Sequence, residues 1–144
     1  MPQNSVESLW HVFNVIGTTE IENLPQKRLE KAKYDLKFMG LAKFEKGQFV
    51  LSDAGVALRE LDQSARKLAF AERMLRSGYV FRAVQMRLTK SIKKREFVAL
   101  LGEQLTHIKS KVYRGASARH IASWADFIHS EFTATEIEES LSAV

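Results

Sequence analysis

The stretch from residue 41 to residue 55, LAKFEKGQFVLSDAG, constrains the fold more than any other part of the sequence. Apolar and polar residues alternate on both sides of Lys46-Gly47, and alternation around a glycine-bearing turn predicts a two-stranded hairpin. Ser52 can cap a helix that begins at Asp53. The sequence therefore predicts a short hairpin over residues 41–51 that leads directly into a helix.

Helical periodicity runs through the chain on both sides of this hairpin. Apolar residues recur at helical spacing near the N-terminus, where Asn4 and Glu7 have the spacing of a capping box. A second apolar stripe runs through residues 26–39, and others follow through residues 68–105. We expect a further helix to open near Ser117, after a basic connector. The pattern predicts a mainly α-helical chain with one small hairpin.

The helix predicted at residues 26–39 has two unlike faces. Its inward stripe consists of Leu29, Ala32, Leu36 and Met39. The opposite side carries Lys27, Lys31, Tyr34 and Phe38, flanked by Lys37. A helix fits the major groove of DNA, where lysines reach phosphates or guanine edges and a tyrosine reaches a phosphate or a base. We expect this outward side to contact DNA.

Two further features bear on that expectation. Lys43 and Lys46 of the hairpin would reach the DNA backbone beside the helix. Against this, Glu30 and Asp35 dilute the positive charge of the helix, and an outward Phe38 equally suits a protein partner. Both interpretations stay open at the level of the sequence.

Charge is distributed unevenly along the 144 residues, whose net charge is +5. Residues 1–61 hold 8 basic and 8 acidic residues, residues 62–119 hold 14 and 4, and residues 120–144 hold none and 5. A strongly basic middle segment indicates a polyanionic partner, although solvated helix faces explain it too.

The basic segment offers three groups of candidate DNA contacts. The first is a run at a predicted helix N-terminus, where cations oppose the helix dipole and phosphate would neutralise them: Lys90, Lys93, Lys94 and Arg95. The second lies in the connector that we expect before the last long helix: Lys109, Lys111 and Arg114. The third is Arg119 on that helix, with His120 at its flank.

Helical spacing also places other side chains of this segment. With Ile121, Trp124 and Ile128 inward, we expect Ala122, Ser123 and Asp126 to face outward beside Arg119. Five further arginines are expected to extend the positive surface: Arg66, Arg73 and Arg76 near one another, then Arg82 and Arg87. Trp124 lies on the apolar stripe and is expected in the core.

Residues 4–61 follow the order helix, connector, helix, hairpin, helix, which resembles the winged-helix superfamily. The segment GLAKFEKGQFVLSDAGVAL is similar to the wing and to the Leu-Ser/Thr-x-x-Gly helix start of winged-helix regulators. The resemblance implies that residues 26–39 form the recognition helix of a helix-turn-helix unit and that residues 41–51 form its wing.

Two later segments resemble parts of larger systems. SARHIASWADFI is similar to the arginine-rich helix ending in Ser-Trp of winged-helix segments attached to restriction-type nucleases, in which a second arginine often stands where this chain has His120. The stretch LSDAGVALRELDQSARKLAFAERMLRSGYVFRAV is similar to C-terminal domains appended to ATPases of the AAA or ABC type. These resemblances imply a nuclease or ATPase partner.

No pattern for catalysis or for a cofactor stands out in the sequence. The seven glycines are scattered, so no phosphate-binding loop is formed, and there is no cysteine. The four histidines, His11, His107, His120 and His129, lack metal-ligand spacing. We therefore expect no catalytic residue, no metal and no cofactor. With neither a signal peptide pattern nor an apolar stretch long enough to span a membrane, we expect a cytoplasmic protein.

The sequence thus predicts a winged-helix unit at residues 1–61 and a second, helix-turn-helix-like unit at residues 62–144, packed together over a shared core. The function predicted is that of a non-catalytic protein that binds double-stranded DNA. It would act as a transcription regulator or as a recognition or accessory subunit of a restriction system or another defence system. The alternative is an adaptor that docks on an ATPase or nuclease through Phe38 and the acidic tail. A homodimer joined through helices within residues 53–88 is a third interpretation.

Overall fold

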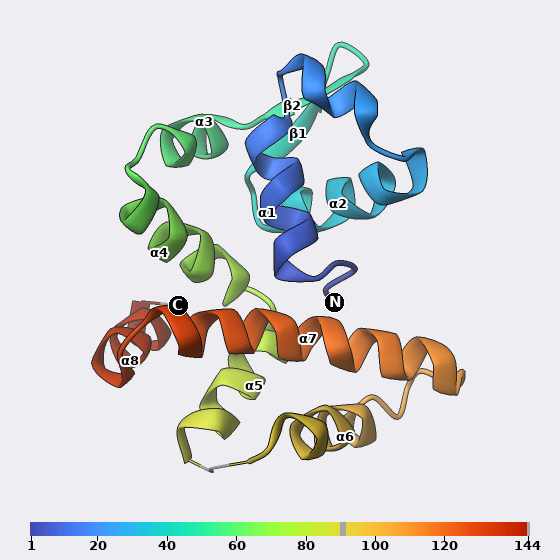
Figure 1. Cartoon of the computed structure of the whole chain (residues 1–144), viewed down its shortest axis with the longest axis vertical. Coiled ribbons are helices and arrows are strands. Elements are labelled where there is room, and N and C mark those ends of the chain that lie inside the picture. Colours follow the sequence, from blue (N-terminus) through green and yellow to red (C-terminus); the bar gives the residue numbers. More distant parts are fainter. Residues whose placement is uncertain (90–91, 144) are drawn as a thin grey trace.

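The computed structural model describes residues 1–89 and 92–143, and Lys90 of the basic segment lies outside them. Within that part of the chain, eight α-helices, one 3-10 helix and one hairpin follow one another (Figure 1). The elements are α1 (Val6–Val15), η1 (Thr19–Asn23), α2 (Gln26–Phe38), β1 (Ala42–Glu45), β2 (Gln48–Leu51), α3 (Asp53–Arg59), α4 (Gln63–Met74), α5 (Gly78–Thr89), α6 (Lys94–Gln104), α7 (Lys111–Glu131) and α8 (Ala134–Ala143). The prediction of a mainly α-helical chain with one hairpin is confirmed.

The hairpin forms where the sequence predicts it. β1 and β2 pair antiparallel with Glu45 opposite Gln48, so only Lys46 and Gly47 form the turn. Both turn residues have positive φ, 51° and 78°. A two-residue hairpin turn needs positive φ at both positions when its twist matches the twist of the flanking strands. Gly55 then allows α3 to pack close to β1, because a Cβ atom there would lie 2.1 Å from the carbonyl oxygen of Leu41.

Helix caps explain where the elements begin, and one of them differs from prediction. The hydroxyl of Ser52 accepts a 3.0 Å hydrogen bond from the backbone N–H of Gly55, so the predicted cap of α3 is confirmed. The predicted cap of α1 by Asn4 is wrong, because Ser5 occupies that position and accepts from the N–H of Ser8. Asn4 instead turns into the protein, where its side-chain amide donates to Asp35 at 2.8 Å.

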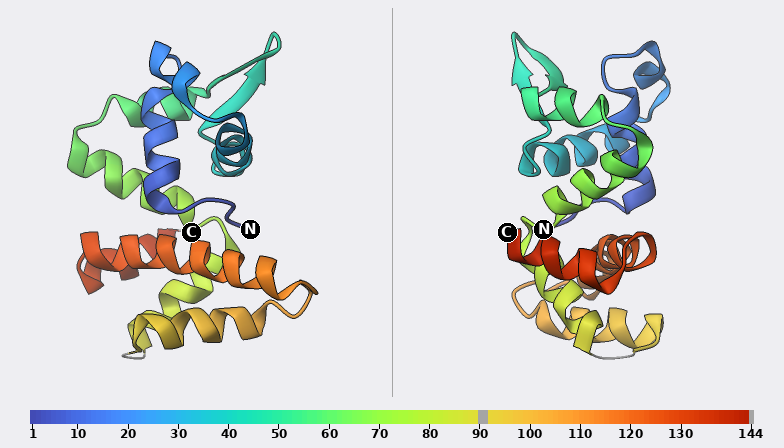
Figure 2. Two further views of the ribbon diagram at one scale, coloured as in Figure 1. Left: turned by 45° about the vertical axis from the view of Figure 1, so that its right-hand side comes forward. Right: turned by 90° about the vertical axis from the view of Figure 1, so that its left-hand side faces the viewer.

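α7 is the longest helix and differs most from the sequence prediction. It begins at Lys111, capped by Ser110, rather than near Ser117. The helix passes through the expected connector because residues 111–131 contain no proline and a single glycine, Gly115. Figures 1 and 2 show α7 lying between a layer formed by α1–α4 and a layer formed by α5 and α6.

A single apolar core joins both layers. Phe70 of α4 packs against Phe13 and Trp10 of α1, with ring centroids 5.4 and 5.0 Å apart. Trp124 of α7 is buried, as expected, and its indole N–H donates to the backbone oxygen of Asn4 at 2.8 Å. The core is therefore continuous across residue 61, where the sequence suggested a boundary between two units. In the described part of the chain, no helix combines the length and the apolar character that a membrane crossing needs.

Candidate nucleic-acid interface

The outer side of α2 is exposed as the sequence predicts. Tyr34 and Phe38 are 51% and 43% exposed, and the three lysines of this side are also exposed: Lys27, Lys31 and Lys37. None of these lysines forms an ion pair with a carboxylate in the part of the chain that the structure describes. The side therefore combines free cations with exposed aromatic rings.

The inner side of α2 corrects one expectation. Asp35 does not dilute the surface charge, because it is buried at 1% exposure. Its carboxylate accepts hydrogen bonds from the backbone N–H of Gln3 and from the side chain of Asn4. Burial raises the pKa of Asp35 to about 6, although these hydrogen bonds and the N-terminal ammonium group oppose the shift. Leu29, expected on this side, is half-buried.

The hairpin supplies fewer free charges than the sequence suggests. Lys46 lies exposed at the turn, whereas Lys43 pairs with Glu45 at 3.3 Å. Lys33 of α2 pairs with Glu30 at 3.2 Å and lies 5.8 Å from the centre of the Phe44 ring. Phe44 itself is 58% exposed. Lys33 of α2 thus contacts the hairpin through the Phe44 ring, and this ring is exposed beside the lysine.

The candidate contacts of the second unit lie at two places. Lys93, Lys94 and Arg95 are exposed at the N-terminus of α6, where the sequence predicts a helix start. The other group is Lys109, Lys111, Arg114 and Arg119. It was expected to include a long basic turn, but Lys111 and Arg114 belong to the first turn of α7. Arg114 bends back to donate to the carbonyl oxygen of Ile108 at 2.8 and 3.1 Å.

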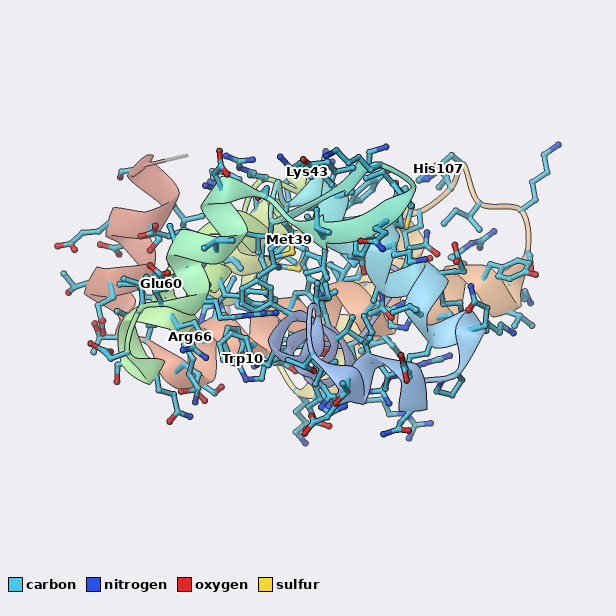
Figure 3. All side chains as sticks on the ribbon, turned by 90° about the horizontal axis from the view of Figure 1, so that it is seen from above. Trp10, Met39, Lys43, Glu60, Arg66 and His107 are labelled. Atoms are coloured by element: carbon cyan, nitrogen blue, oxygen red, sulfur yellow. The ribbon has the colours of Figure 1, made fainter. Side chains whose placement is uncertain are left out.

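A second set of cations, which we call the inward arginines, is used within the fold. It comprises Arg59, Arg66, Arg73, Arg76 and Arg87, which donate to backbone carbonyl or side-chain amide oxygens of the protein. Arg87 also forms an ion pair with the Asp126 carboxylate. The expectation that Arg66 lies near Arg73 and Arg76 is wrong. Arg73 and Arg76 both donate to the carbonyl oxygen of Met39, whereas Arg66 donates to Asn14. Seen from above, Arg66 lies near Trp10, away from Lys43 of the hairpin (Figure 3).

The side of α7 that was expected to face outward is also partly used within the fold. Ala122 is buried, Ser123 accepts a 3.0 Å hydrogen bond from the N–H of Val6, and Asp126 pairs with Arg87 at 3.2 Å. The reason is that α7 is covered on two sides, by α1 and α4 and by α5 and α6. An apolar stripe along one face of a helix predicts that only this face packs against the rest of the protein.

A concavity joins the two units at the end of α2 nearest α7. It has a volume of about 410 Å³, and we call it the junction hollow. The side chains that matter for its chemistry come from α1 and its cap, from α2 and from α7: Ser5, Ser8, Lys27, Arg28, Lys31 and His120. Burial lowers the pKa of His120, and the nearby charges of Lys31 and Arg119 lower it further, against a hydrogen bond to the Pro2 backbone.

The junction hollow brings together residues that the sequence only partly singled out. Lys27, Lys31 and Arg119 were predicted as DNA contacts. Lys27 and Lys31 line the hollow together with His120, whereas Arg119 lies next to His120 on α7 but does not line the hollow. Arg28 and Ser8 were missed, although the Nε of Arg28 donates to the Ser8 hydroxyl at 3.0 Å. Arg28 lies between the apolar face and the lysine-bearing face of α2. The sequence therefore does not show its partner, because the contact with Ser8 depends on where α1 packs. Lys93, Lys94 and Arg95 do not line this hollow.

The described residues contain no group of three or more histidine, aspartate or glutamate side chains that could hold a metal ion. No protein-family model, no curated protein and no solved structure matches this chain. These comparisons therefore give no support to the resemblance to winged helices.

Proposed function

We propose that the chain is a winged-helix protein that binds double-stranded DNA without catalysing a reaction on it. The order α1, η1, α2, β1–β2, α3 supports this proposal, with η1 at the place of a short second helix. In this arrangement α2 enters the major groove and the β1–β2 wing lies along the neighbouring backbone. Tyr34 and the lysines of α2 then meet phosphates and base edges.

The observation that carries the proposal is the meeting of free cations from both units. Lys27 and Lys31 of α2 line the same hollow as His120 of α7, and Arg119 lies close enough to His120 to affect its pKa. None of these three cations is paired with a carboxylate in the described residues. An uncompensated positive surface that joins two separate segments suits the backbone of a nucleic acid.

The experiment is a fluorescence-polarisation titration with duplex DNA at several salt concentrations. Removing one phosphate-binding cation should weaken binding about tenfold and lower the salt slope by about one, so we expect both effects from Lys31→Met. Lys67→Met is the matched control, because Lys67 pairs with Glu131 on the side of α4. Binding that does not respond to salt, or an equally weakened affinity in both variants, contradicts the proposal.

The biological setting is proposed from the resemblances alone. A free transcription regulator and a recognition or accessory subunit of a restriction or defence system both use such a module. Affinity for many unrelated duplexes would favour the accessory role, whereas a strong preference for one duplex would favour the regulator.

A second candidate function is an adaptor for a nuclease or ATPase, and exposed apolar side chains favour it. Val112 and Tyr113 at the start of α7 are 77% and 71% exposed, more than the rings of Tyr34, Phe38 and Phe44. The acidic tail suits this role less well, because Glu131 pairs with Lys67 and Glu136 caps α8. Absence of DNA binding at low salt would favour the adaptor.

A homodimer is the third candidate, and size-exclusion chromatography tests it. The helices suggested for its contact, α3, α4 and α5, bury apolar residues within the chain itself, among them Leu58, Phe70 and Val80. A dimer would therefore have to use other faces of these helices.

A further inference from the structure

We propose that the junction hollow is a binding site for one phosphate group and that residues of α1, α2 and α7 together form this site. This inference depends on the proposed function in one respect, since it names the chemical group that the same surface recognises. It goes further in assigning a discrete, saturable site rather than a diffuse positive field.

The donors of the hollow are arranged for a single oxyanion. Lys27 and Lys31 are one helical turn apart on α2 and line the hollow together. Arg28 is held in place because its Nε donates to the hydroxyl of Ser8 at 3.0 Å. Its two terminal nitrogens donate to no other described residue, so they can form the paired hydrogen bonds that guanidinium groups make with phosphate.

The charge of the hollow is not balanced from within the protein. Its three cations form no ion pair with a carboxylate of the described residues. Asp35, the carboxylate on the inner side of α2, is already bonded to Gln3 and Asn4. A bound phosphate would supply the missing negative charge in a concavity of about 410 Å³ that stays open to solvent.

His120 provides a reporter inside the hollow. Without a ligand its pKa lies below the ordinary value, because the ring is partly buried and Lys31 and Arg119 are near. An anion in the hollow offsets these cations and favours the protonated ring, so the His120 pKa should rise when phosphate binds.

The phosphate can come from two sources that share this chemistry. One is a phosphodiester of a DNA strand, and the other is the phosphate of a free phosphomonoester. The α2 lysines serve either ligand. The two sources differ in whether duplex DNA competes with inorganic phosphate for the hollow.

The test is an NMR titration of the full chain with inorganic phosphate as the probe. We expect saturable shifts confined to residues around the junction hollow, with a rise in the His120 pKa. Lys31→Met should weaken phosphate binding about tenfold, as expected for removal of a charged hydrogen bond. Arg28→Lys keeps the charge but removes the planar fork, and should also weaken binding. Lys67→Met removes one charge elsewhere and should leave binding unchanged.

Several outcomes would overturn the inference. These are shifts that do not saturate, an unchanged His120 pKa, an Arg28→Lys variant that binds phosphate like wild type, or equal weakening in Lys67→Met. If the wild-type protein then still binds duplex DNA with steep salt dependence, the inference of a phosphate site is wrong and the proposed function stands. If phosphate binds as expected but duplex DNA neither binds nor competes, the phosphate site stands, its ligand is a phosphomonoester, and the proposed function fails.

Discussion

The lysines of α2 and the inward arginines are both cations on helices, yet the fold uses them in opposite ways. Lys27, Lys31 and Lys37 extend into solvent without partners in the described residues. The inward arginines point to carbonyl oxygens at helix ends and turns, as Arg73 and Arg76 do at Met39. Guanidinium groups have five donors and a long apolar stem, which suits them to this internal role.

This contrast changes how the charge of the chain is interpreted. The segment from residue 62 to residue 119 has the largest positive excess, but six of its arginines donate to backbone or side-chain oxygens of the protein: Arg66, Arg73, Arg76, Arg82, Arg87 and Arg114. The first 61 residues are balanced in sequence, yet α2 presents free lysines because Asp35 is buried and Glu30 pairs with Lys33. Net charge along a sequence is thus a poor guide to where free charge lies.

The largest effect should come from the one charge that α2 directs inward. The pKa of Asp35 is raised from 3.8 to about 6, so the folded state holds its proton more tightly than the unfolded state. Between these two pH values, rising pH removes stability, by about 3 kcal/mol in total, and above them the loss is complete. We expect Asp35→Asn to lack this loss.

Urea unfolding of wild type and Asp35→Asn at pH 4 and pH 7 measures the difference. The stability of wild type relative to the variant should fall by about 2.4 kcal/mol from the lower to the higher pH, because part of the total change lies below pH 4. A relative stability that is constant or rises with pH would show that the Asp35 pKa is not raised.

The second effect concerns an inward arginine. Arg87 pairs with Asp126 at 3.2 Å and stacks over Phe97 at 4.8 Å, so Arg87→Met should cost about 2 kcal/mol of unfolding free energy by leaving Asp126 unpaired. The double variant with Asp126→Leu should recover part of this loss. Duplex binding at low salt should stay unchanged in Arg87→Met, and a tenfold weaker affinity there would break the contrast between the two groups of cations.

The third effect is the reverse case, Lys31→Met. We expect its unfolding free energy to stay within about 0.5 kcal/mol of wild type, because Lys31 is an exposed residue with no described ion pair. The effect should appear only in binding, and thermal unfolding monitored by circular dichroism serves as the check. A clear decrease in the melting temperature would mean that this lysine, too, serves the fold.

The last effect is smaller than the tenfold loss of duplex binding expected for Lys31→Met, and it tests the unexpected start of α7. Ser110→Ala removes the hydroxyl that accepts from the N–H of Tyr113 and should cost about 1 kcal/mol. The matched change Ser117→Ala lies within the helix and should cost nothing or stabilise it slightly. Hydrogen exchange at residues 111–116 should be faster in Ser110→Ala alone. If the two variants reverse these roles, the helix begins where the sequence suggested.

Local patterns predicted local structure well, and packing decided the rest. The hairpin turn at Lys46-Gly47 and the Ser52 cap follow from backbone preferences of a few neighbouring residues, so they could be predicted. The roles of Asn4 and Arg28 could not, because each depends on a partner on another element, Asp35 in one case and Ser8 in the other. The outward side of α2 was predictable, whereas the junction hollow required the position of α7.

The hydrogen bond from Trp124 to Asn4 has a practical consequence for spectroscopy. The chain has two tryptophans. Trp124 donates a hydrogen bond to the segment before α1, whereas Trp10 contacts Phe70 of α4 edge to face. Detachment of that segment would expose the Trp124 indole to water and shift its fluorescence emission to longer wavelength, while Trp10 kept its aromatic contacts. A Trp10→Phe variant therefore offers an intrinsic optical probe of the N-terminal residues, separate from global unfolding.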